Sequence, residues 1–144
     1  MKYLYIIFIL IISLPIYSIS IDEFTSLCEK GDTKKMEENI SSIEINEQNS
    51  KGIPPLICAV ISNNAKAVKL LIDHGADLNI KDSSGSTPLL NAIANYNYEI
   101  IELLVNEGAD VNIADRYNIS PLFHCVQNSG DITYFNDYLS VLLI

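Results

Sequence analysis

Apolar residues along the middle of the chain fall into pairs of short runs separated by polar turns. Leu89, Ala92 and Ile93 recur at helical spacing, and a second apolar run spans residues 100–104. Gly108 follows that run, at a point where a helix end favours a residue that accepts positive φ. The pattern predicts two short helices joined by a tight turn and followed by an extended, turn-forming segment.

This pattern recurs with a period of 33 residues. Shifted by that distance, residues 52–56 (Gly-x-x-Pro-Leu) match residues 85–89, and residues 75–79 (Gly-Ala-Asp-x-Asn) match residues 108–112. Matches this dense at one fixed offset indicate an internal structural repeat, in which each unit buries its apolar face against its neighbours.

Residues 85–93 (GSTPLLNAI) and 99–112 (EIIELLVNEGADVN) resemble an ankyrin repeat, for which both the period and the Thr-Pro-Leu sequence are typical. Thr87 offers an N-cap hydroxyl and Pro88 a preset first helical residue. The resemblance implies an all-α fold, a solenoid of stacked helix-turn-helix units with turn or hairpin connections.

The resemblance also divides the chain into units. We expect a signal peptide at 1–20, a degenerate N-terminal capping repeat at 21–48, whole repeats at 49–81 and 82–114, and an incomplete C-terminal repeat with an insertion at 115–144. Because the last unit stops without its exit turn, we expect residues 141–144 to be half-covered and to leave an apolar patch, as in a truncated product or a fragment of a longer array.

The first twenty residues predict export. They contain one Lys and no acid, and Ser18 and Ser20 have the spacing that a signal peptidase prefers. We therefore predict a bacterial-type secretory signal cleaved after Ser20, and a secreted or periplasmic protein. The alternative is an uncleaved N-terminal membrane anchor, but the apolar core at residues 4–14 is short against the ~20 residues that a membrane span needs.

The chain is acidic, with 9 Lys and Arg, 18 Asp and Glu and a formal net charge of −9. Loss of Lys2 with the signal would make the charge −10. Such a surface repels nucleic acid and anionic lipid, so we expect no nucleic-acid partner and no membrane contact after cleavage. An electrostatic partner is expected to be basic.

Two Asp-x-Asn-x-x-Asp segments, at 77–82 and 110–115, resemble the start of a calcium loop. The twelfth positions, which should be Glu, are Pro88 and Pro121, so we predict no metal site. Asp77, Asn79 and their equivalents 33 residues later are instead expected to brace turns. No glycine-rich phosphate loop is present, and no cofactor is expected.

The sequence also lacks a catalytic constellation. His124 and Cys125 are adjacent, and adjacent residues on a helix point about 100° apart, so they are not expected to share a site. His74 is expected to cap a helix end. Stacked repeats would hold Cys28, Cys58 and Cys125 in different layers, which predicts three free, packed thiols. The chain is not expected to be an enzyme.

The resemblance to ankyrin repeats implies a scaffold that binds another protein through turn tips and first-helix faces, which the helices hold in a rigid concave row. The implied contact positions are Ser50, Lys51, Ile53, Ile61, Lys81, Ser83, Ser84, Ser86, Asn95, Arg116, Tyr117, Ile119, Gln127 and Asn128. Arg116 and Tyr117 are the expected anchors, since Arg and Tyr are enriched in binding hot spots. An alternative function is an inhibitor or immunity-type protein whose acidic surface neutralises a basic enzyme or toxin.

Overall fold

The computed structural model describes residues 18–128 and 140–143. The predicted signal peptide and the predicted insertion therefore lie largely outside the described residues. The helices are α2 (Ile21–Lys30), α3 (Thr33–Asn39), the 3-10 helix η1 (Ile40–Ser42), α4 (Pro55–Ile61), α5 (Ala65–Asp73), α6 (Pro88–Ala94), α7 (Tyr98–Asn106) and α8 (Pro121–Asn128). A short helical segment at 140–142 follows, and neither described range contains a strand.

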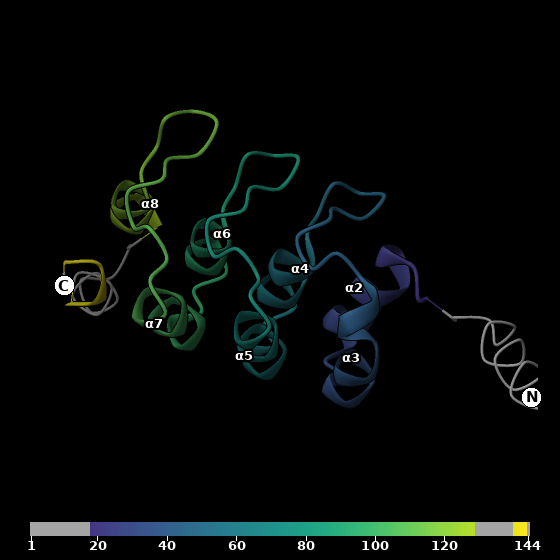
Figure 1. Cartoon of the computed structure of the whole chain (residues 1–144). Helices are drawn as coiled ribbons and strands as arrows, with labels where there is room; N and C mark the ends of the chain where they lie inside the picture. Colours follow the sequence, from purple (N-terminus) through teal and green to yellow (C-terminus); the bar gives the residue numbers. More distant parts are fainter. Residues whose placement is uncertain (1–17, 129–139, 144) are drawn as a thin grey trace, which may run out of the picture.

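The helices form two layers in one continuous stack (Figure 1). The first helices α2, α4, α6 and α8 pack in chain order, and the second helices α3, α5 and α7 pack in a row beside them. The connections that lead into α4, α6 and α8 project on one side of the stack. This arrangement confirms the predicted all-α solenoid of helix-turn-helix units.

Local sequence fixes where each helix begins. The Thr87 hydroxyl accepts a hydrogen bond from the Leu90 N–H at 3.2 Å, and Pro88 is the first residue of α6, as predicted. Asn64 and Asn97 cap α5 and α7 in the same way, through the N–H groups three residues later. Because these caps satisfy amides that have no partner within the helix, helices of only 7 to 9 residues are stable in the stack.

The core is a single apolar cluster that runs through every layer. Ala59, Ala92 and Cys125 occupy the same small position on successive first helices and are 0 %, 0 % and 1 % exposed. Small side chains here let neighbouring first helices approach closely. Leu71 and Leu104, from the second helices, are fully buried in the same cluster.

The last described residues of the chain are more deeply buried than the sequence predicts. Val141 and Leu142 are only 6 % and 7 % exposed and belong to the core cluster, so the prediction that they are half-covered is wrong. Their apolar side chains are drawn into the same core as the helices before them. Leu143 is 69 % exposed, and Ile144 lies outside the described residues.

The start of α2 also adds a feature that the sequence reading missed. Ser20, the residue after which cleavage is predicted, is the N-cap of α2 and forms a capping box with Glu23. The Glu23 N–H donates to Ser20 Oγ at 3.2 Å, and the Ser20 N–H donates to Glu23 Oε2 at 3.0 Å. Ile19 packs against the core. Cleavage after Ser20 would remove both contributions.

Across the described ranges, every helix is too short or too polar to span a bilayer.

Candidate functional site

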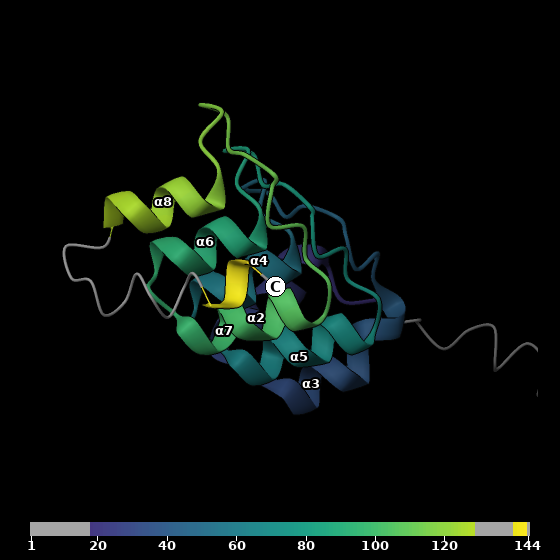
Figure 2. The same cartoon turned by 90° about the vertical axis from the view of Figure 1, so that its left-hand side faces the viewer.

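Three loops of the same construction lie on one side of the stack (Figures 1 and 2). We call them loop 1 (residues 49–53), loop 2 (residues 82–86) and loop 3 (residues 115–119). In each, the first residue donates its N–H to the carbonyl of the last, at 3.0 to 3.1 Å. The loops therefore have the same tight shape, and each leads directly into a first helix.

One side-chain oxygen holds each loop closed from within. Asn49 Oδ1 accepts the N–H groups of the residues two and four positions later, both at 3.0 Å. Asp82 Oδ1 accepts the equivalent pair at 2.8 and 3.0 Å, and Asp115 Oδ1 does the same at 2.8 and 3.0 Å. These hydrogen bonds satisfy amides that no helix can satisfy, which makes the loops locally rigid.

The loops are also bound to one another. The Ser83 N–H of loop 2 donates to the Gly52 carbonyl of loop 1 at 2.8 Å. A Cβ on Gly52 would lie 2.6 Å from Ser83 Cβ, and the Gly52 φ is 74°, so only glycine fits this contact. Between loops 2 and 3, Arg116 donates from Nη2 to the Ser83 carbonyl at 3.1 Å and from Nε to the Ser84 carbonyl.

A second line of contacts runs along the base of the loops. Gln48 Nε2 donates to the Lys81 carbonyl, and Lys81 Nζ donates to the Ala114 carbonyl, each at 3.0 Å. Donor and acceptor are 33 residues apart in both pairs, so the bonds join equivalent positions of adjacent repeats. The loops thus form one connected row.

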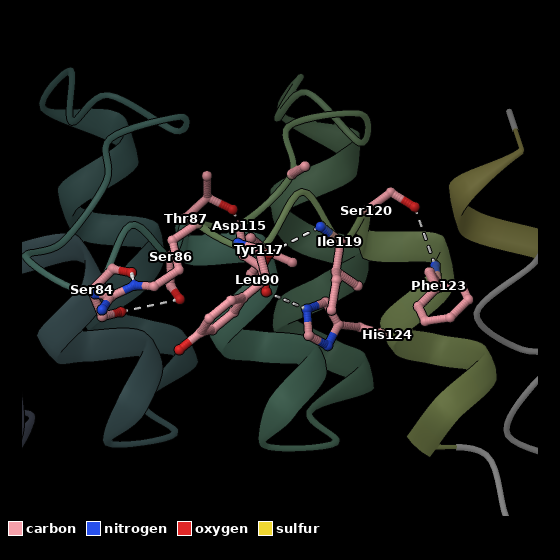
Figure 3. A network of polar contacts seen from close by, with 12 residues as sticks. Ser84, Ser86, Thr87, Leu90, Asp115, Tyr117, Ile119, Ser120, Phe123 and His124 are labelled. Atoms are coloured by element: carbon pink, nitrogen blue, oxygen red, sulfur yellow. Dashed lines mark hydrogen bonds and ion pairs between the residues drawn. The ribbon is translucent and has the colours of Figure 1, made fainter.

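Loop 3 is additionally tied to the helix that follows it (Figure 3). His124 Nε2 lies 3.0 Å from Asp115 Oδ2, and the Asp115 side chain is 11 % exposed. The Ile119 N–H, the His124 ring and the Tyr117 N–H together hold the pKa of Asp115 below its ordinary value, against the opposing effect of partial burial. Asp115 therefore stays ionised and keeps accepting these bonds.

Loop 2 shows the same balance at Asp82. Partial burial acts to raise the pKa of Asp82, but hydrogen bonds from Ser84, Ser86 and Asn91 outweigh it, and the pKa lies below its ordinary value. In loops 2 and 3, the ionised carboxylates thus accept the hydrogen bonds that hold the loops closed.

The structure places the predicted contact residues in two groups. The exposed positions are Ser50, Lys51, Ile61, Lys81, Ser83, Ser84, Asn95, Arg116, Tyr117 and Gln127. Ile53, Ser86 and Ile119 are partly buried at the last position of each loop, and Ile53 packs on the core. The Asn128 side chain lies outside the described residues.

The two expected anchors differ in what they offer. The Arg116 guanidinium is already bound to loop 2, so it has a structural role that the sequence reading missed. Tyr117, at the tip of loop 3, is 74 % exposed. No other large hydrophobic side chain in the described ranges is as exposed. Of the two expected anchors, Tyr117 is therefore the one whose side chain is largely exposed.

Other polar residues brace the turns between repeats, as expected. The Asn79 N–H donates to Asp77 Oδ1 at 2.9 Å, and Asn79 Oδ1 accepts the Asp110 N–H of the next repeat at 2.8 Å. His74 Nδ1 lies 2.8 Å from the Leu70 carbonyl oxygen at the end of α5, which confirms its role at a helix end.

The three cysteines are free and buried, which confirms that prediction. Burial raises the pKa of Cys28 to about 12 and the pKa values of Cys58 and Cys125 to about 11, so the thiols are neutral at physiological pH. His124 pairs with Asp115 rather than with Cys125. In the part of the chain that the structure describes, no group of three His, Cys, Asp or Glu could hold a metal ion.

Comparison with protein families decides the assignment. A family model described as ankyrin repeats in three copies matches residues 25–115 and again residues 75–136. The first match alone covers more than half of the chain. The chain is an ankyrin-repeat protein. Ankyrin repeats are generally protein–protein interaction modules and generally non-catalytic, so this ankyrin-repeat protein is expected to act by binding. A search of curated proteins finds no match to it.

Proposed function

We propose that this ankyrin-repeat protein binds a protein partner outside the cytoplasmic membrane, through the tips of loops 1 to 3 and the adjoining ends of the first helices. The observation that carries the proposal is the connected row of loops, in which main-chain and side-chain hydrogen bonds join loop 1 to loop 2 and loop 2 to loop 3. A row held in this way has little conformational entropy left to lose on binding.

Tyr117 is the proposed central anchor, because a large and exposed aromatic side chain contributes contact area at a low entropic cost. Lys51, Ser83 and Ser84 are exposed on the neighbouring loops and would form the surrounding contacts. Arg116 and Lys81 contribute first by holding the row together.

Affinity capture from the envelope of the exporting cell tests this function. The wild-type chain, the Tyr117→Ala variant and the Tyr98→Ala variant serve as parallel baits, and Tyr98 is an exposed residue on α7, away from the loops. We expect Tyr117→Ala to weaken the captured complex by roughly 30-fold, the effect of a residue worth about 2 kcal/mol, and Tyr98→Ala to leave it unchanged. Equal retention by all three baits would count against the loop tips.

A second candidate function rests on the net charge of −9. An inhibitor or immunity-type protein would use the carboxylates of the second helices to neutralise a basic enzyme or toxin. Its association rate should fall steeply as salt is added and should not depend on Tyr117, whereas binding through the loop tips should be weakened by Tyr117→Ala.

Export remains part of the proposal, with a change in the favoured cleavage site. The Ser20 capping box and the packing of Ile19 support a mature chain that keeps both residues, as after cleavage before Ile19 or with an uncleaved anchor. The intact mass and N-terminal sequence of the protein isolated from its host test this. A mature chain that begins at Ile21 would contradict it.

A further inference from the structure

The loop row, counted together with Lys81, has a formal charge of +1, from Lys51, Lys81 and Arg116 against Asp82 and Asp115, whereas the chain as a whole is acidic. Its exposed ionised side chains include Lys51 on loop 1, Lys81 directly before loop 2 and Arg116 on loop 3. These are three of the nine basic residues in a chain of formal charge −9. Each repeat junction on this side therefore presents one cation.

In the described part of the chain, no salt bridge joins these cations to a carboxylate, although the charge of Lys51 adds to the hydrogen bonds from Ser50 in lowering the pKa of Asp22. Lys81 and Arg116 donate to main-chain carbonyl groups, which carry no net charge. Among the described residues, the salt bridges of lysine are those of Lys35 and Lys69, on the second helices, and none involves the cations of the row.

The carboxylates nearest the loops accept hydrogen bonds from this chain, and of the three only Asp22 is exposed, whereas Asp82 and Asp115 are partly buried. Asp82 and Asp115 each close their own loop, and Asp115 also contacts His124. Asp22 Oδ1 accepts both the N–H and the hydroxyl of Ser50, at 2.9 and 2.7 Å. These hydrogen bonds lower the pKa of Asp22, Asp82 and Asp115, so the carboxylates stay ionised, and in each of them Oδ1 already accepts hydrogen bonds from donors of this chain.

A ligand that approaches the tips therefore meets exposed cations that form no salt bridge with the described carboxylates, and carboxylates that already accept hydrogen bonds at Oδ1. The acidic side chains of the second helices, such as Glu99 and Glu102 on α7 and Glu107 at its C-cap, lie on the other layer of the stack. At physiological salt the Debye length is ~8 Å, so distant charges are screened and contacts at the row respond mainly to local charge.

We propose that the loop row docks an acidic protein segment, whose carboxylates pair with Lys51, Lys81 and Arg116 and whose apolar side chains pack on Tyr117. This partner chemistry is the reverse of what the net charge predicts. The carboxylates of a short acidic segment would pair with the three exposed cations, whereas a nucleic acid, as an extended polyanion, would also meet the acidic remainder of the chain. The inference rests on the proposed function, because it specifies the partner of the same surface.

Two peptides of equal length test the charge preference, one made of Glu, Tyr, Gly and Ser and the other with Lys in place of each Glu. Each is titrated into the protein purified from its host, and the amide chemical shifts are followed by NMR. We expect the Glu peptide to shift the amides of loops 1 to 3 and the Lys peptide to leave them in place. The Glu-peptide shifts should shrink as salt is added.

Charge-removing variants supply the control. Lys51→Gln should weaken Glu-peptide binding several-fold, whereas Lys66→Gln, at an exposed position of α5 on the second-helix layer, should leave it unchanged. Shifts of the loops by the Lys peptide, by both peptides equally or by neither would overturn the proposal. A captured partner that needs Tyr117 but contacts the row through basic residues would overturn the acidic-segment inference and leave the proposed function standing.

Discussion

Removal of the Asp82 carboxylate should be the most informative single perturbation of the loop row. Asp82 Oδ1 accepts the Ser84 N–H at 2.8 Å, the Ser86 N–H at 3.0 Å and the Ser84 hydroxyl at 2.6 Å. Asp82→Ala leaves all three donors to find water, and a net contribution of about 1 kcal/mol per hydrogen bond gives a loss of about 2 to 3 kcal/mol in the free energy of unfolding.

Asp82→Asn is the matched control, because loop 1 is closed by equivalent hydrogen bonds to a side-chain amide oxygen, that of Asn49. Asn49 Oδ1 accepts the two equivalent N–H groups of loop 1 at 3.0 Å. The Asn variant should therefore keep the loop closed and lose only the extra strength of charge-assisted bonds, for a cost of about 1 kcal/mol or less.

Urea unfolding followed by circular dichroism measures both variants against wild type. We expect the midpoint to fall in the order wild type, Asp82→Asn, Asp82→Ala, with an unchanged dependence on urea concentration. If Asp82→Ala lowers the free energy of unfolding by less than about 0.5 kcal/mol, as most surface substitutions do, the reasoning is refuted. Equal losses for the two variants would also refute it.

Four further outcomes follow from the same structure. Ser20→Ala should lower the free energy of unfolding by about 1 kcal/mol through loss of the α2 capping box, and Ser20→Thr should recover most of it in thermal unfolding. The pKa values of Asp22, Asp32, Asp82 and Asp115 are lowered by folding, so their contribution is complete above the ordinary value of 3.8 and is lost as the pH falls through the folded-state values. An unfolding free energy that does not decrease in that acid range would contradict this. The three buried thiols should react slowly with a thiol reagent in the native protein and fully after denaturation, so rapid native labelling would contradict their burial. Tyr117→Ala should change stability by less than about 0.5 kcal/mol, since the side chain is exposed, and a larger loss in urea unfolding would assign Tyr117 to the fold.

The stack could be predicted because its determinants are local and repeated. Thr87, Pro88 and Gly108 mark helix boundaries in the sequence, and the 33-residue period indicates that the helices pair in layers. The period also identifies the small positions, Ala59 and Ala92, where layers meet. The first repeat matches the 33-residue period less closely than the others. Its first helix, α2, has 10 residues, whereas α4 and α6 have 7.

The exposure of the loop tips could be predicted, but the bonding of their side chains could not. Arg116 was expected to be free for a partner, and its guanidinium instead binds carbonyl groups 32 and 33 residues earlier. Such contacts form only after two layers stack, since nothing in the local sequence shows how far a long side chain reaches. A search for donor and acceptor pairs near the repeat distance could have suggested them.

The contact between Asp115 and His124 was missed for a related reason. In the sequence His124 stands beside Cys125, whereas its partner in the fold lies 9 residues earlier, at the start of loop 3. Residues at this spacing meet in loop 1 as well, where Asn49 Nδ2 lies 3.8 Å from Cys58 Sγ. The first loop residue and the fourth residue of the following helix are therefore neighbours whenever the loop closes.

Hydrogen exchange on the complex with the captured partner tests the central claim most directly. The account predicts that binding slows amide exchange at residues 50–53, 83–86 and 116–119 and leaves α3, α5 and α7 unchanged. Protection confined to those second helices, with the loop row exchanging as in the free protein, would contradict it.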